Sequence, residues 1–79
     1  MKHLIKQLIT TAGKLEDIIF NNEKLFLDMY SKGKWSELIG VSFHHSGIEF
    51  IYLLYEGATV SDGISWTEFE KFIEVVDEN

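Results

Sequence analysis

The stretch that decides the fold is IEFIYLLYEG, residues 48–57. It is rich in isoleucine and aromatic residues, which favour β-strands, and a glycine ends the run. Successive side chains of a strand point to opposite faces. One face then carries Ile48, Phe50, Tyr52 and Leu54, and the other carries Ile51, Leu53 and Tyr55. Both faces are apolar, so each of them needs a cover.

A second strand is predicted just upstream. Apolar side chains alternate there with small ones, and the apolar members are Ile39, Val41 and Phe43. This period-2 pattern is typical of a half-buried strand. HHSG, residues 44–47, has the composition of a turn. The two strands are therefore predicted to form an antiparallel hairpin.

Downstream of the hairpin the sequence indicates a short extended piece and another turn. Thr59 and Val60 favour a third, short strand, and Asp62-Gly63 is a common turn dipeptide. The sheet is therefore either a two-stranded hairpin or a three-stranded meander.

The N-terminal segment has helical periodicity. Apolar residues recur at i, i+3 and i+4 over residues 4–12, which predicts a short amphipathic helix ending near Gly13. Packing on the sheet is the favoured use of its apolar face, ahead of a membrane surface. Lys6 and Gln7 interrupt the apolar run that a signal peptide needs, and no segment has the length of a membrane span.

Residues 15–30 continue the helical pattern, and Gly33 would close that helix as a C-cap. Asn22 is the one polar member of the apolar stripe. The alternative is that the Asn21-Asn22 pair forms a turn, which would make 15–20 and 24–30 a hairpin. The sequence favours the helix.

The last helix has the clearest predicted start. Ser65 is a candidate N-cap and Glu68 completes a capping box, while Ile64 and Phe69 form a hydrophobic staple. The predicted buried face consists of Trp66, Phe69, Phe72, Ile73 and Val76, and the predicted solvent face of Glu70, Lys71, Glu74 and Asp77.

These elements predict one domain over residues 1–79, a small two-layer α+β fold. It would hold an N-terminal helix or helical hairpin, the antiparallel sheet and a C-terminal helix. The second face of the 48–57 strand would meet either further helices of the same chain or a second protein.

Composition points to a partner protein. The chain has no cysteine, so disulfides and thiolate metal sites are excluded. A core in a domain of this size rarely supplies more than about 3–5 kcal/mol without such staples. Because 46% of the residues are apolar and 14% aromatic, the apolar surface to spare favours a partner chain, including a homodimer.

Charge is unevenly distributed. Residues 1–34 hold six lysines and four acids, whereas residues 35–79 hold one lysine, Lys71, and nine acids. The net charge is −6 and there is no arginine, so the sequence argues against direct binding of nucleic acid, which requires phosphate neutralisation. An acidic half suits a basic protein partner.

The sequence argues against an enzyme. His44 and His45 are adjacent, so in a strand they would point to opposite faces, and no third ligand stands at a zinc spacing. Ser46 follows them in a turn without a nucleophile elbow, and no phosphate-binding glycine loop is present. We therefore expect no catalytic, metal or cofactor site.

The candidate partner-binding residues are of two kinds. Carboxylates on the hairpin and last helix could imitate nucleic-acid phosphates in a basic cleft, and the selected ones are Glu49, Glu56, Glu70, Glu74 and Asp77. The alternative is an ordinary solvated surface. Tyr52 and Tyr55 are the candidate apolar contacts, because tyrosine is favoured in interface cores.

The function predicted from sequence is a small acidic, non-enzymatic protein-binding module. It would inhibit a basic, nucleic-acid-handling protein by occlusion. The bias toward isoleucine, lysine and asparagine fits an AT-rich source such as a phage or mobile element, so the expected location is the cytoplasm, that of the host for a phage protein. The alternatives are a self-associating structural or adaptor protein and an antitoxin or immunity protein.

Overall fold

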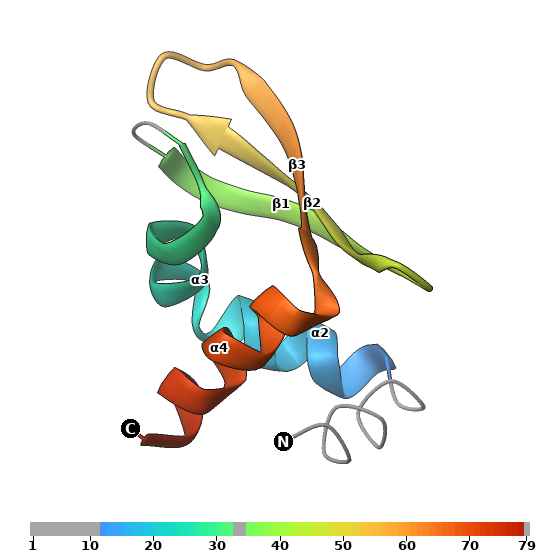
Figure 1. Ribbon diagram of the computed structural model, residues 1–79. Coiled ribbons are helices and arrows are strands. Elements are labelled where there is room, and N and C mark those ends of the chain that lie inside the picture. The colour runs from blue at the N-terminus through green and yellow to red at the C-terminus, as the bar shows by residue number, and fades with distance from the viewer. Residues whose placement is uncertain (1–11, 33–34, 79) are drawn as a thin grey trace.

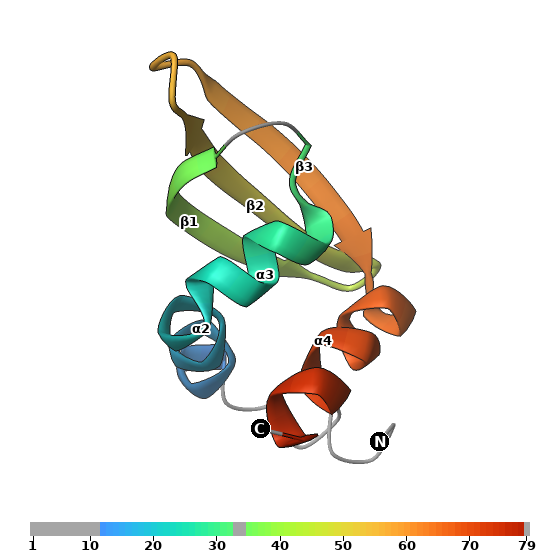
Figure 2. The same ribbon diagram turned by 90° about the vertical axis from the view of Figure 1, so that its left-hand side faces the viewer.

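The structure, a computed structural model, is a three-stranded antiparallel sheet with helices packed on one of its faces (Figures 1 and 2). It describes residues 12–32 and 35–78. The elements in chain order are α2 Ala12–Asn21, α3 Glu23–Tyr30, β1 Trp35–His44, β2 Gly47–Leu54, β3 Thr59–Ser65 and α4 Trp66–Glu78. This confirms the α+β class and selects the three-stranded meander, with strand order β1-β2-β3.

The helical segment before the sheet is interrupted at Asn22. Its backbone N–H reaches the Ile19 carbonyl (3.1 Å), and its side-chain amide donates to the Ile18 carbonyl (2.8 Å). The chain therefore turns there, as the Asn-Asn pair indicated, and residues 15–30 form parts of two helices instead of the one continuous helix that the sequence favoured.

Two predicted helix ends are wrong. The first helix was predicted to end near Gly13, but Gly13 lies inside α2, and residues 1–11 are outside the described part of the chain. The second was predicted to end with Gly33 as its C-cap, but α3 stops at Tyr30. Ser31 is the C-cap, in an extended conformation, and its N–H donates to the Leu27 carbonyl (2.9 Å). Gly33 itself lies outside the described residues.

Strand β1 does not follow simple alternation, because its register with β2 shifts between Leu38 and Gly40. The extra residue of this bulge lets Leu38 take the place opposite Tyr52, where Leu38 is only 4% exposed. Ile39 was predicted to be buried, but it is 50% exposed. The prediction failed there because the sequence gives no sign of the bulge.

The two connections of the sheet differ in how well the sequence anticipated them. The predicted first turn is confirmed, with His44 paired to Gly47 across a two-residue loop. The predicted Asp62-Gly63 turn is wrong, because both residues lie within β3. The turn between β2 and β3 instead uses Gly57, whose φ of 96° suits a glycine, and its N–H donates to the Leu54 carbonyl (2.9 Å).

The core lies between the sheet and the helices. Phe50 of β2 meets Phe26 of α3 edge-to-face with ring centroids 4.9 Å apart, and Phe72 of α4 meets Phe26 at 5.2 Å. Such pairs add to the free energy gained by burying the rings. The buried set also includes Ile48 and Tyr52, so the even-numbered face of β2 packs on the helices. Of the two apolar faces of IEFIYLLYEG, this one is covered by the described helices.

The start of α4 is the one that the sequence predicted. Ser65 Oγ accepts a hydrogen bond from the Glu68 N–H (3.1 Å), and the Glu68 carboxylate accepts one from the Ser65 N–H (2.9 Å). Both bonds of the capping box are therefore present. Ile64 and Phe69, the predicted staple, belong to the same buried cluster.

Candidate functional site

The face of the sheet that points away from the helices is the candidate functional site. Since Ile48, Phe50 and Tyr52 point to the core, the strand register places their neighbours on the other side. We call this set the outer face: Glu37, Gly40, Ser42 and His44 from β1, Gly47, Glu49, Ile51 and Leu53 from β2, and Thr59, Ser61, Gly63 and Ser65 from β3.

The centre of the outer face is apolar and open. Ile51 is 41% exposed although it lies on the central strand, and Leu53 beside it is half-buried. Their cross-strand neighbours are small, since Ile51 pairs with Gly40 on one side and Ser61 on the other. A Cβ placed on Gly40 would meet no atom within 4 Å. Among the described residues, no helix covers this centre.

The charge of the outer face is negative. Glu37 and Glu49 are both exposed there, one paired with Leu53 and the other two residues before Ile51. No lysine or arginine occurs anywhere in residues 35–65. Apart from histidine, the three strands therefore carry no side chain that could neutralise these carboxylates.

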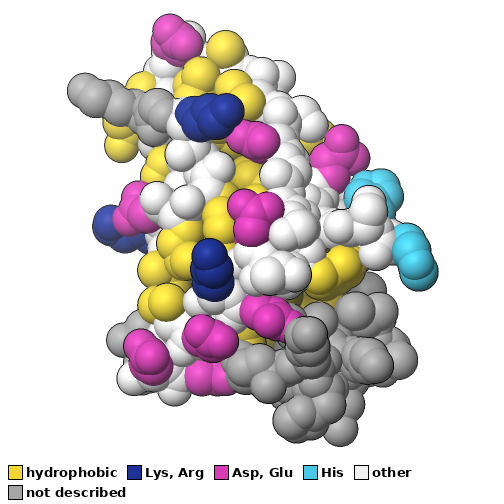
Figure 3. Space-filling view, in the orientation of Figure 1, with side chains coloured by type: hydrophobic (Ala, Val, Ile, Leu, Met, Phe, Trp, Pro, Cys, Tyr) yellow, Lys and Arg dark blue, Asp and Glu magenta, His cyan; other side chains and the backbone are white. Residues whose placement is uncertain are grey.

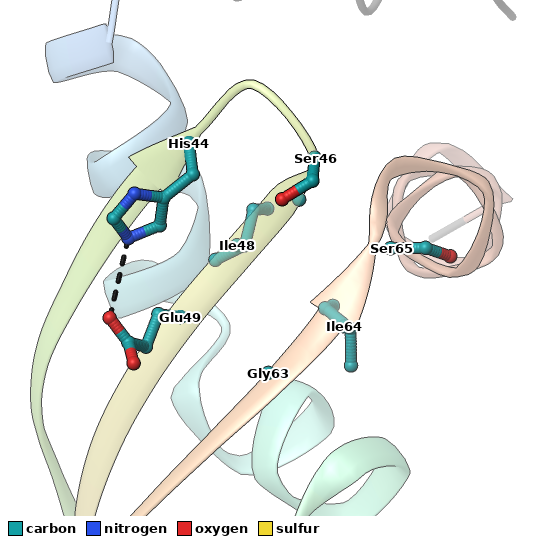
Figure 4. A pocket seen from close by; sticks show the side chains of 8 residues that line it. His44, Ser46, Ile48, Glu49, Gly63, Ile64 and Ser65 are labelled. Atoms are coloured by element: carbon teal, nitrogen blue, oxygen red, sulfur yellow. Dashed lines mark ion pairs between the residues drawn. The ribbon is translucent and has the colours of Figure 1, made fainter.

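An open groove of about 470 Å³ lies at the hairpin end of the sheet (Figure 4). His44 and Glu49 stand along one side, with the His44 Nε2 3.3 Å from a Glu49 carboxylate oxygen. Gly63 and Ser65 of β3 line the other side. Both members of the His44–Glu49 pair are more than half exposed, so the contact contributes little to stability.

The edges of the sheet carry side-chain acceptors. Strand pairing alternates, so every second residue of an edge strand turns its N–H outward. Three edge N–H groups already donate to carboxylates: Leu38 to Glu23 (2.7 Å), Gly63 to Asp62 (2.9 Å) and Ser65 to Glu68 (2.9 Å). Occupied donors of this kind hinder the addition of another strand. The outer face is therefore a better candidate for binding than the edges.

The two predicted tyrosine contacts have different environments. Tyr52 is fully buried within the chain, and its hydroxyl accepts a hydrogen bond from the Lys32 N–H (3.1 Å). Tyr52 therefore belongs to the core and not to a contact surface, because the helices cover its face. Tyr55 is 72% exposed in the turn after β2.

The predicted carboxylates are not gathered into one patch. Glu49 lies near the start of β2, and Glu56 lies in the turn that follows the other end of the strand. The other three, Glu70, Glu74 and Asp77, are on α4 in the helical layer; Glu74 and Asp77 are exposed and Glu70 is half-buried. Figure 3 shows acidic side chains from the top of the visible face to its lower edge, where several lie near one another. The five thus belong to at least two surfaces.

Sequence reasoning missed Glu37 and Ile51 as surface residues of one site. The signal for Ile51 was present, since it is on the odd-numbered face of the 48–57 stretch. Glu37 could not be placed, because the register shifts between Trp35 and Glu37 and between Leu38 and Gly40 determine which strand residues share a face.

A second groove, of about 410 Å³, lies at the junction of α2 and α3. Lys24 and Asp28, which line this groove, form an ion pair with each other, and Lys24 Nζ lies 2.9 Å from the Asp28 carboxylate. Hydrogen bonds from Lys24 and from the Trp35 indole (3.1 Å) lower the pKa of Asp28. This charge is already partnered, so the groove is a weaker candidate than the outer face.

Other kinds of site were also sought. The described residues contain no group of three or more histidine and acidic side chains placed to hold a metal ion. None of the described helices is both long and apolar enough to cross a membrane. The chain matches no family model, and comparisons with characterised proteins and with solved structures reveal no significant similarity.

Proposed function

We propose that this protein is a non-enzymatic binding module that holds a basic protein partner on its outer face. The observation that carries the proposal is Ile51, which is 41% exposed at the middle of a sheet face that has carboxylates and no lysine. Burying Ile51 and Leu53 would supply affinity, and Glu37 and Glu49 would select a cationic partner.

The partner class that fits best is a nucleic-acid-handling protein. Such proteins present basic clefts that neutralise phosphates, and an acidic module of net charge −6 is attracted to them. Binding would occlude the cleft, which is the action of an inhibitor encoded by a phage or mobile element and active in the host cytoplasm. An antitoxin or immunity protein would act in the same way on a toxin.

Capture of a basic protein with two charge-reversed variants tests the proposal. One carries Glu37→Lys and Glu49→Lys on the outer face, and its matched control carries Glu74→Lys and Asp77→Lys on α4. Both pairs are exposed and change the net charge equally. We expect the outer-face variant to lose a partner that the wild type captures, and the α4 variant to keep it.

A third variant tests the apolar contribution. Ile51→Thr keeps a β-branched residue in the strand and removes part of the apolar surface. Partner binding should weaken while the free energy of unfolding changes little. If the outer-face charge-reversed variant still bound the partner and the α4 variant did not, the binding site would lie on α4 and the proposal would be wrong. Once the captured enzyme is purified, the wild type should inhibit it in competition with nucleic acid.

Self-association through the same face is the second candidate, favoured by the exposed Ile51. Two copies meeting face to face would bring Glu37 and Glu49 of each near those of the other, so added salt should strengthen a homodimer. Added salt should instead weaken the binding of a basic partner. The sign of the salt dependence therefore separates the two candidates.

A further inference from the structure

In the groove at the hairpin end, the Glu49 carboxylate has one oxygen that does not contact His44. His44 contacts one oxygen of the Glu49 carboxylate, and the second oxygen is turned away from the imidazole (Figure 4). The other polar side chains of the groove, from Ser46 and Ser65, are hydroxyls. The groove thus offers acceptors and a negative charge, and His44 is the only one of its described lining residues that can carry a positive charge.

The β3 side of the groove has a glycine, Gly63, that the fold does not require. A Cβ on Gly63 would lie 3.5 Å from the Ile48 carbonyl oxygen, an ordinary contact, and φ of Gly63 is not positive. By contrast, a Cβ on Gly47 would lie 2.1 Å from the Ile64 carbonyl oxygen. A glycine inside a strand weakens it and often marks a bulge, a tight bend or a close approach of a ligand or another backbone. The β2–β3 register shows no bulge at Gly63.

We propose that this groove receives an arginine side chain of the basic partner, which deepens and rests on the function proposed above. The aliphatic part would lie over Gly63, where no side chain obstructs it, and the guanidinium would reach the Glu49 carboxylate. Arginine fits better than lysine because its planar fork pairs with a carboxylate and stacks on a ring such as the His44 imidazole.

The test is a titration of the ¹⁵N-labelled protein with N-acetyl-arginine methylamide, followed by amide chemical shifts. We expect saturable shifts centred on Gly47, Glu49 and Gly63. The lysine analogue should bind several-fold more weakly, and the neutral citrulline analogue should give no saturable shift. Glu49→Gln should weaken binding about tenfold, and Gly63→Val, which places a side chain on the β3 side of the groove, should abolish it. Glu74→Gln is the matched control on α4 and should leave binding unchanged.

Three results would overturn the inference: shifts that grow without saturation at all exposed carboxylates, binding unchanged in Glu49→Gln, or binding unchanged in Gly63→Val. Equal binding of the lysine analogue would overturn the choice of arginine. None of these results bears on whether the outer face captures a partner, which the charge-reversed variants decide separately. Loss of capture in the α4 variant alone would contradict the proposed function even if the arginine analogue binds.

Discussion

Two glycines of the sheet show how one residue type meets different demands. Gly47 begins β2 directly beside the chain entering α4, and the carbonyl of Ile64 occupies the space that a side chain would take. Gly40 lies on the outer face with open space around it. Neither has a positive φ, so only their surroundings distinguish them.

Gly47→Ala is therefore expected to destabilise the protein, and Gly40→Ala is its matched control. The new Cβ at position 47 would lie 2.1 Å from a backbone oxygen, and moving the strands apart should cost about 1–3 kcal/mol of unfolding free energy. The change at position 40 should be within about 0.5 kcal/mol of wild type. Denaturant unfolding measures both, and equal stabilities would show that the strands β2 and β3 are not so close.

Tyr30 links α3 to α4, because its hydroxyl donates to the Glu68 carbonyl. Burial raises the pKa of Tyr30 from its ordinary value of 10.0 to about 12. The folded state therefore keeps the phenol proton more tightly than the unfolded state. The contribution of the Tyr30 phenol to the stability of the folded state is therefore fully present below pH 10. It is lost as the pH rises toward 12.

The expected result is a decline of stability from pH 10 to 12 that is smaller in Tyr30→Phe than in wild type. Phenylalanine keeps the ring packed on Phe26 and removes the ionisable group. At neutral pH this variant should lose about 1 kcal/mol with the hydrogen bond. Thermal melts across this pH range measure the decline. In Tyr30→Phe, phenolate absorbance should show one tyrosine fewer than in wild type ionising at the high end of this range. Identical pH profiles would mean that Tyr30 ionises freely in the folded protein.

At the scale of elements, α4 and β1 show when local sequence is sufficient. The start of α4 depends on residues at most five positions apart, from Ile64 to Phe69, so it can be recognised from the local sequence. The bulge in β1 depends on Tyr52, which is fourteen residues from Leu38. No local sequence pattern predicts that Leu38, and not Ile39, pairs with Tyr52 across the strands.

Ser65→Ala should cost about 1 kcal/mol, because the Glu68 N–H loses its side-chain acceptor. Ser65→Thr keeps a hydroxyl at the cap and should retain most of the stability. Far-ultraviolet circular dichroism during denaturant unfolding gives both values. If alanine and threonine were equally stable, the capping box would contribute nothing to the fold.

At the scale of the whole molecule, the outer face makes association sensitive to salt. Light scattering at low salt should give a mass near that of one 9.2 kDa chain, because the carboxylates of two outer faces repel each other. A rise in mass on adding salt would indicate the homodimer. A stable dimer at low salt that persists in Ile51→Thr would show that association does not use the outer face.

The candidate site was only partly predictable. The odd-numbered face of the 48–57 stretch was recognised as apolar, and Ile51 and Leu53 remain on it. The five predicted carboxylates were grouped by charge alone, and the fold separates Glu49 on the sheet from Glu74 on α4. Tyr52 was chosen as a contact because sequence alternation does not say which of two apolar faces the helices cover.

The sequence by itself determined the α+β class, the hairpin turn at 44–47 and the capped start of α4, because each depends on periodicity or on contacts between near neighbours. Only the tertiary structure decided that Asp62-Gly63 continues a strand, that Leu38 is buried in place of Ile39, and which face of β2 is left open. The physical reason is that these outcomes depend on cross-strand register and on helix packing. Both bring together residues far apart in the chain, and no local pattern encodes them.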